Sequence, residues 1–305
     1  MYQKRGHRSP TVNCQKSLRL LHAELNDLLL SSIMAKSMNK NIYRAALVLV
    51  SIFYSTFIIA DVKIKELKNQ RPNRILFVGN SYLYYNDSLH NHVRRMAEER
   101  FPERTKMTAY KSATIGGSRL SHHNLDYLLD SKNIGLKKNF ELVILQGGSS
   151  EPLSEDSRHA FYRQVQEKVE MIRAKEGEAA LYMTHAYAEP HKAFDPKMIN
   201  HIKDTYLRAG NDNNVLVIPV GLAFAEAHEQ RPDLQLHKSF DGSHPSLLGT
   251  YLASCVVFAS IFNSSPIGLD YNYFNSVSDA DRVFLQGIAN QTIANFYTKQ
   301  DWGLR

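Results

Sequence analysis

Three side chains of this sequence have the types that nucleophilic acyl transfer requires. Ser81 follows the apolar run 75–78 and Gly79, while Asp241 and His244 lie three positions apart far downstream. A serine hydroxyl is a weak nucleophile, so it needs a base to take its proton and an acid to orient that base. We therefore predict that Ser81 attacks an ester carbonyl, that His244 transfers the proton, and that Asp241 orients the imidazole ring.

From residue 74 onward, short apolar runs alternate with amphipathic stretches, which is typical of parallel strands joined by helices. The run 142–145 is apolar on both faces, as in a central parallel strand. The sequence therefore predicts an α/β fold. The expected strands are 75–78, 107–111, 142–145, 180–184 and 215–218, and the expected helices are about 88–100, 155–175, 195–209, 246–262 and 279–298.

The carboxyl ends of parallel strands form the edge at which α/β sheets bind their ligands. Ser81 follows the first expected strand, Gly116 and Gly117 follow the second, and residues 146–150 follow the third. We therefore expect these three clusters to converge on one edge of the sheet.

Over roughly residues 74–265 the sequence resembles the SGNH, or GDSL-like, hydrolase superfamily. The first block of that family, Gly-Asp-Ser, is similar to residues 79–81, with Asn80 in place of Asp. Its second block is similar to residues 113–118, with Gly117 as the matching glycine, and its last block, Asp-x-x-His, matches residues 241–244. The resemblance implies a serine esterase or acetylesterase with a flavodoxin-like, three-layer α/β/α sandwich around a central, mainly parallel five-stranded sheet.

The third block departs from the family pattern. The family has Gly-x-Asn-Asp, whose Asn donates a hydrogen bond to the oxyanion, whereas residues 146–152 contain no Asn. Two alignments put either Ser149 or Ser150 in the Asn position, and some members similar to sugar O-acetylesterases carry a Gln-Gly pair here. The resemblance thus implies an oxyanion site made of the Ser81 and Gly117 amides and one side chain among Gln146, Ser149 and Ser150.

Aromatic and imidazole side chains near these blocks allow more than one interpretation. Tyr82, Tyr84 and Tyr85 follow the nucleophile, where they either form an aromatic wall for a sugar or acyl group or pack under the sheet edge. The pairs His90/His92 and His122/His123 lack a Cys or carboxylate framework with metal-ligand spacing, so we expect solvated helix-face residues. We predict no metal and no cofactor.

Charge is concentrated at the front of the chain. Of 37 Lys and Arg and 30 Asp and Glu, residues 1–60 hold eight and two, which leaves 29 and 28 for the remainder. The nearly neutral remainder does not indicate a nucleic-acid partner, and its length suits one large α/β domain. Of the two cysteines, Cys14 lies in the front segment and Cys255 in an apolar stretch, where we expect a core residue.

The front segment has the pattern of a targeting signal. Lys40 and Arg44 precede the apolar stretch 45–60, which ends at Ala60. This predicts either a secretory signal cleaved near Ala60 or an uncleaved signal anchor. An extension over 1–44 precedes this segment, and we expect translation to start at Met34 or Met38. The hydrolase-like domain is expected over 61–305.

Together these features predict an exported, periplasmic or extracellular serine hydrolase that cleaves short-acyl, O-acetyl-type esters of carbohydrates. Its expected partner is a small-molecule or glycan ester, with membrane contact only through an uncleaved front segment. Two alternatives stay open: a carbohydrate-binding protein of this fold with weakened turnover, and a lipase- or lysophospholipase-like esterase. A phosphate site at Gly147-Gly148 is disfavoured because no Lys follows the glycines.

Overall fold

The computed structural model describes residues 61–298, and its centre is a five-stranded sheet. The strands lie in the order β2-β1-β3-β4-β5, and every neighbouring pair is parallel. Their bounds are β1 (Arg74–Gly79), β2 (Ala109–Thr114), β3 (Leu142–Leu145), β4 (Glu178–Tyr182) and β5 (Leu216–Ile218). This order places a topological switch point between β1 and β3, where ligands of such sheets bind.

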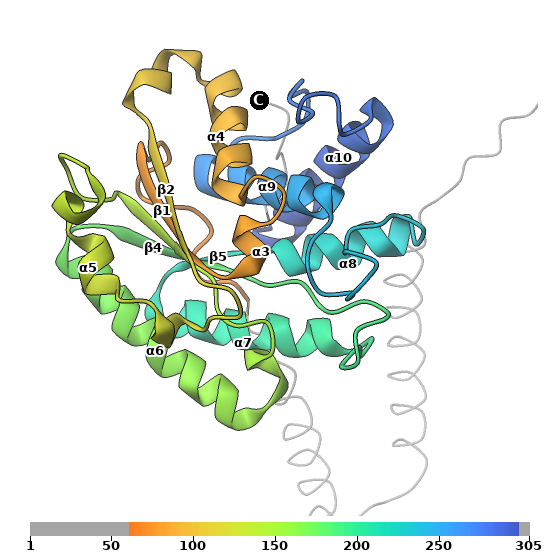
Figure 1. Cartoon of the computed structure of the whole chain (residues 1–305), viewed down its shortest axis with the longest axis horizontal. Coiled ribbons are helices and arrows are strands. Elements are labelled where there is room, and N and C mark those ends of the chain that lie inside the picture. Colours follow the sequence, from red (N-terminus) through yellow and green to blue (C-terminus); the bar gives the residue numbers. More distant parts are fainter. Residues whose placement is uncertain (1–60, 299–305) are drawn as a thin grey trace, which may run out of the picture. The chain divides into compact units, whose positions relative to one another are not determined.

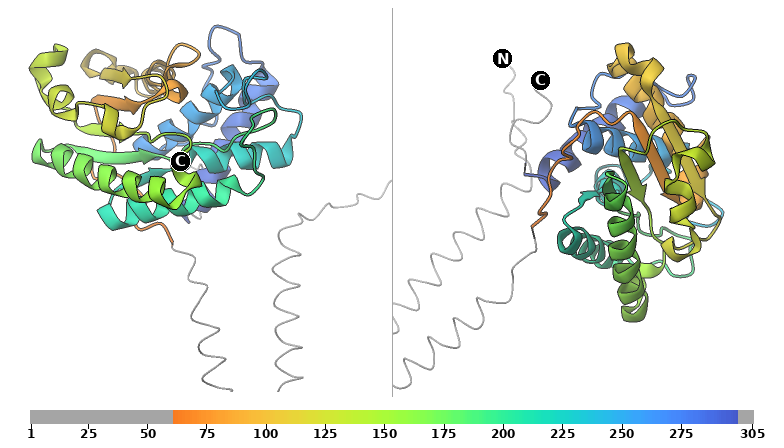
Figure 2. Two further views of the ribbon diagram at one scale, coloured as in Figure 1. Left: turned by 60° about the horizontal axis from the view of Figure 1, so that its bottom comes forward. Right: turned by 90° about the vertical axis from the view of Figure 1, so that its left-hand side faces the viewer.

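Helices cover both faces of the sheet (Figures 1 and 2). On one face lie α4 (Leu89–Arg100), α8 (Val220–Gln230), α9 (Leu247–Phe262) and α10 (Asp279–Phe296), and on the other lie α5 (Leu125–Leu129), α6 (Glu155–Ala174) and α7 (Met198–Asn213). The short helix α3 (Ser81–Tyr84) directly follows β1, and 3-10 turns occur at Pro102–Met107, Leu120–His122, Ser131–Ile134 and Glu151–Leu153.

Side-chain alternation along the strands explains the three layers. In β1, Ile75 and Phe77 pack into the core under α9, whereas Leu76 and Val78 pack into the core on the opposite face. Successive strand residues point to opposite faces, so a strand covered on both sides must be apolar at every position. The predicted three-layer α/β/α fold with a five-stranded parallel sheet is confirmed.

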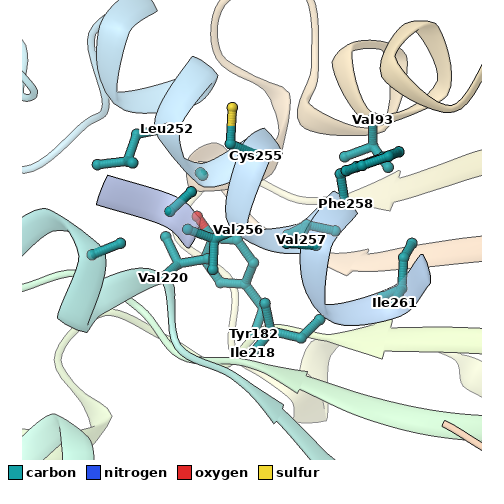
Figure 3. Packing of buried hydrophobic residues seen from close by; sticks show 14 of the residues in the cluster. Val93, Tyr182, Ile218, Val220, Leu252, Cys255, Val256, Val257, Phe258 and Ile261 are labelled. Carbon is teal, nitrogen blue, oxygen red and sulfur yellow. The ribbon is translucent and has the colours of Figure 1, made fainter. Parts of the chain in front are cut away.

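Helix α9 forms the centre of the larger core. Every residue from Gly249 to Phe262 is buried, as expected for a helix that is apolar all round. Figure 3 shows side chains of this helix, among them Val256 and Val257, beside Tyr182 and Ile218 of the sheet. Cys255 is fully buried, which confirms its predicted place in the core.

All five expected strands and all five expected helices are present; β3 has the predicted ends, and the ends of the others are shifted. The edge strand β2 begins two residues later than predicted and extends to Thr114, because it pairs with β1 as far as Gly79. Helix α8 was not among the expected elements. The predicted extension at 1–44 and signal or anchor at 45–60 lie outside the described residues. Within residues 61–298, no helix is both long and apolar enough to cross a bilayer.

Candidate active site

The turn after β1 places Ser81 at the switch point of the sheet. β1 ends at Gly79, and the Asn80 side chain caps α3 by accepting a hydrogen bond from the Tyr82 amide at 3.1 Å. A side chain at position 79 has no room, because a Cβ there would lie 2.3 Å from the Oε1 atom of Gln146. The tight turn therefore ends the strand and begins the helix within three residues.

The Asn80 side chain also connects this turn to the two neighbouring loops. Its Nδ2 donates to the carbonyl oxygens of Ser118 at 3.1 Å and Gly147 at 3.4 Å. An aspartate in its place has acceptor atoms only when ionised and could make neither bond. Asn80 is 3% exposed and stabilises the turn through two hydrogen bonds that the Asp of the family could not donate. We call this its brace role.

The three residues predicted to form a triad meet in space. The His244 Nε2 atom lies 2.9 Å from the Ser81 Oγ atom, and its Nδ1 atom hydrogen-bonds Asp241 Oδ2. Asp241 Oδ1 accepts from the Ser243 amide at 2.9 Å and the His244 amide at 3.1 Å. Burial opposes ionisation of Asp241, but these hydrogen bonds outweigh it and lower its pKa. The ionised carboxylate favours a proton on Nδ1, which leaves Nε2 free to accept the proton of Ser81.

The loop that carries Asp241 and His244 packs against the segment after β4. Gly242 has a φ of +62°, and a Cβ on it would lie 2.0 Å from the Ala188 carbonyl oxygen. The Gly242 carbonyl in turn accepts from the Ala188 amide at 2.8 Å. A glycine is therefore required at the second position of the Asp-x-x-His block.

His185 supports the same loop from the interior. Its ring stacks between Tyr82 and Phe224, with centroid distances of 4.2 and 4.3 Å, and its Nε2 donates to the Ser243 carbonyl at 2.8 Å. Burial lowers the pKa of His185 well below 6.5, so the ring is neutral. His185 was not among the predicted site residues, although it directly follows the expected strand 180–184, at the edge where such sheets bind ligands.

The three tyrosines that follow Ser81 were expected either to form an aromatic wall for a ligand or to pack under the sheet edge, and the structure shows both arrangements. Tyr82 is 3% exposed, and its hydroxyl lies 2.8 Å from the Ser243 hydroxyl. Tyr85 stacks on the His244 ring at a centroid distance of 4.4 Å. Tyr84 is 41% exposed and lines the cleft. Tyr82 and Tyr85 thus pack within the site, and Tyr84 is free to contact a ligand.

A cleft of about 430 Å³ opens at Ser81. It is lined by small and polar residues and by the three tyrosines: Asn80, Ser81, Tyr82, Tyr84, Tyr85, Gly116, Gly117, Arg119, Gly148, Ser149, Ser150, Ser243 and His244. Within residues 61–298, neither the Ser81 amide nor the Gly117 amide donates to another group. Both donors are therefore available to an acceptor atom of a ligand.

Of the three side chains considered as a further oxyanion donor, Gln146 is excluded by its contacts. It is fully buried and does not line the cleft. Its Oε1 accepts from the Asn80 amide at 2.8 Å, and its Nε2 donates to the Gly147 carbonyl. Gln146 therefore stabilises the nucleophile turn, and its amide is not among the groups that line the cleft.

Ser149 and Ser150 both line the cleft, but they differ in surroundings. Ser150 is exposed, whereas Ser149 is half-buried and accepts a hydrogen bond from the Tyr187 hydroxyl at 2.9 Å. That bond fixes the Ser149 oxygen, whose own hydrogen can donate to a ligand or to the nearby Tyr82 hydroxyl. Ser149 is therefore the better-positioned side-chain donor.

Two of the four histidines considered as metal ligands are core residues. His92 is fully buried between the Asn86 carbonyl at 2.6 Å and the Tyr271 hydroxyl at 2.9 Å, and His123 bonds the Ser118 hydroxyl at 3.0 Å. The prediction that they are solvated is wrong, because buried hydroxyl and carbonyl groups partner their nitrogens. Within the described range, no three His, Cys, Asp or Glu side chains are grouped so as to hold a metal.

Solved structures with a similar fold are known. A DUF4886 family protein from Bacteroides uniformis superposes with a TM-score of 0.57 at 19% identity, covering 72% of this chain and 93% of that one. A candidate GDSL-like lipase from Parabacteroides merdae gives 0.50 at 12%, covering 67% and 99%. A candidate SGNH hydrolase from Slackia heliotrinireducens gives 0.49 at 22%, covering 62% and 98%.

No protein-family model and no curated protein matches the sequence. The order of the strands in the sheet and these superpositions nonetheless indicate the same fold. The chain has the fold of the SGNH, or GDSL-like, hydrolases.

Proposed function

We propose that the protein is an exported serine esterase that removes short acyl groups, O-acetyl groups foremost, from carbohydrates. The observation that carries the proposal is the unbroken hydrogen-bond series from Ser81 Oγ through the His244 ring to Asp241. Export is proposed from the basic and apolar pattern of residues 40–60.

The proposed reaction has two steps. Ser81 Oγ attacks the ester carbonyl while His244 Nε2 takes its proton, and the Ser81 and Gly117 amides stabilise the negative oxygen. His244 then gives the proton to the departing alcohol, which leaves an acyl group on Ser81. A water molecule, deprotonated by His244, then attacks this acyl-enzyme. The bond between the acyl group and Ser81 Oγ breaks, His244 returns the proton to Ser81 Oγ, and the carboxylic acid leaves.

The cleft lining supports short acyl groups over long chains. Among its described residues there is no Leu, Ile, Val, Met or Phe, and its walls are glycines together with serine, tyrosine, asparagine, arginine and histidine side chains. A long acyl chain gains affinity by burying CH₂ groups against apolar side chains, at about 0.8 kcal/mol each. This lining offers little such surface, so a lipase-like function is disfavoured.

The purified full chain should be assayed with 4-nitrophenyl acetate, butyrate and octanoate, and with acetylated xylan. We expect kcat/KM to be highest for the acetate, acetate release from the polymer, and loss of both in Ser81→Ala. A preference for octanoate would contradict the short-acyl assignment. Binding of the glycan without any turnover by folded protein would instead favour a carbohydrate-binding function.

A further inference from the structure

The cleft at Ser81 carries one fixed charge. Of its lining residues in the described part of the chain, Arg119 alone is a Lys, Arg, Asp or Glu. Asp241 and the other carboxylates near the loops are absent from the lining. The one charged side chain of Lys, Arg, Asp or Glu type that a ligand meets in this lining is therefore a cation, which the hydrolysis of a neutral ester does not require.

The fold anchors the Arg119 stem at the centre of the site. The preceding residue, Ser118, is 1% exposed, and its hydroxyl donates to the Gly79 carbonyl at 3.1 Å. On the other side, a Cβ built on Gly148 would lie 3.1 Å from the Arg119 Cγ atom. The stem thus packs over Gly148, between the second and third blocks of the site.

The Arg119 guanidinium has no acidic partner of its own. Within residues 61–298, no carboxylate forms an ion pair with it. Glu151 is near enough to be influenced by its charge, but it is 2% exposed and its Oε2 accepts from the Gly148 amide at 2.5 Å. An unpaired guanidinium in a ligand cleft is suited to a carboxylate, which it can bind through two parallel hydrogen bonds.

A second cation, which lines a neighbouring cavity, lies near one wall of this cleft. The Lys238 Nζ atom lies 6.0 Å from the centroid of the Tyr85 ring, and Tyr85 lines the cleft. Lys238 is half-buried and, like Arg119, forms no ion pair with any described carboxylate. The two cations reinforce one another in attracting an anion.

We propose that the substrate is an ester whose alcohol part carries a carboxylate, such as an O-acetylated acidic sugar, and that Arg119 binds this carboxylate. The inference rests on the proposed esterase function. An acetyl group has no position for a charge, so the carboxylate must belong to the sugar. Arg119 is in this account a specificity-determining residue.

The test uses one sugar in two charge states. The full-length protein is assayed with O-acetylated methyl glucuronoside and with the same compound whose carboxylate is blocked as a methyl ester. We expect the wild-type kcat/KM to favour the free carboxylate by about tenfold, the lower range for a charge-assisted hydrogen-bonded pair. The preference should weaken with added salt, because the cleft is open to solvent.

Three variants make the test specific. Arg119→Met keeps the packing over Gly148 and should lose the tenfold preference, because KM rises more for the acid than for the methyl ester. Arg119→Lys keeps the charge and should retain part of the preference. Arg163→Met, an exposed residue of α6 outside the cleft, should retain all of it.

Two results would overturn the inference. Equal wild-type kcat/KM values for the two compounds would show that the enzyme does not select the carboxylate. An equal fall in kcat for both compounds in Arg119→Met would show that Arg119 stabilises the oxyanion instead. Failure of the esterase proposal itself is visible separately, as absent turnover of 4-nitrophenyl acetate. In that case, titration of Ser81→Ala with glucuronate and its methyl ester still decides whether Arg119 selects the acid.

Discussion

The hydroxyl groups of Tyr82 and Ser243 lie 2.8 Å apart, across 161 positions of sequence. Tyr82 directly follows the predicted nucleophile, and Ser243 directly precedes the predicted base. This hydrogen bond therefore joins the two halves of the site next to the atoms that must meet. Its position indicates that the Ser81–His244 distance is held by neighbours as well as by the pair itself.

Replacing Tyr82 with Phe should impair turnover more than folding. The change removes the bond to Ser243 but keeps the ring between its neighbours, so we expect a loss of about 1 kcal/mol, or roughly a fivefold lower kcat/KM on 4-nitrophenyl acetate. Tyr127→Phe, at an exposed tyrosine of α5, is the matched control and should leave kcat/KM unchanged. Equal rates for Tyr82→Phe and wild type would show that the bond does not position the pair.

Replacing Asn80 with Asp, the residue typical of the family, should destabilise this chain. The carboxylate would lose the bonds to the Ser118 and Gly147 carbonyls at a buried position, at a cost of about 2 kcal/mol or more in the free energy of unfolding. Urea denaturation measures the change. Asn124→Asp is the control, because that exposed helix cap only accepts a hydrogen bond and should tolerate the change. A stable Asn80→Asp protein would contradict the brace role.

Replacing Ser149 with Ala tests the third oxyanion donor. If the Ser149 hydroxyl donates to the oxyanion, its removal should lower kcat by about 10- to 100-fold while KM stays nearly constant, since the bond forms in the transition state. Ser150→Ala, at the exposed neighbour, should lower kcat less than twofold. The reverse order of effects would assign the donor to Ser150 and support the other alignment of the block.

Stability should fall as the pH drops below about 6.5. Burial lowers the pKa of His185 well below 6.5 and that of His237 to about 4, so the unfolded chain binds protons that the folded chain does not. Each such imidazole reduces the free energy of unfolding by up to about 1.4 kcal/mol per pH unit between 6.5 and its folded pKa. Urea denaturation from pH 7.5 to 5 measures the slope, which should be smaller in His237→Phe than in His159→Phe. Unfolding free energies that do not change with pH would contradict the burial of neutral imidazoles.

Much of the fold was predictable because it depends on local pattern. The apolar run 142–145 is strand β3 itself, since a strand covered on both faces has to be apolar throughout. The edge strand β2 was predicted less well, because its residues are mostly half-buried or exposed and give a weak pattern. Helix α8 begins directly after β5 without a side-chain cap, so it lacked the usual start signal.

The site was predictable in its motifs and not in its supporting contacts. Ser81, Asp241 and His244 could be found from residue types and spacing, and they meet as expected. The stabilisation of the nucleophile turn by Gln146 depends on a contact with the Asn80 amide across 66 positions, which no local pattern specifies. For the same reason the packing of His185 against Tyr82 became visible only in three dimensions.

The most direct test of the central claim is covalent labelling by a fluorophosphonate, which reacts with a serine activated by a neighbouring base. We expect mass spectrometry to place the label on Ser81, and labelling to disappear in Ser81→Ala and in His244→Ala. Folded wild-type protein that stays unlabelled, or a label on any other serine, would contradict it.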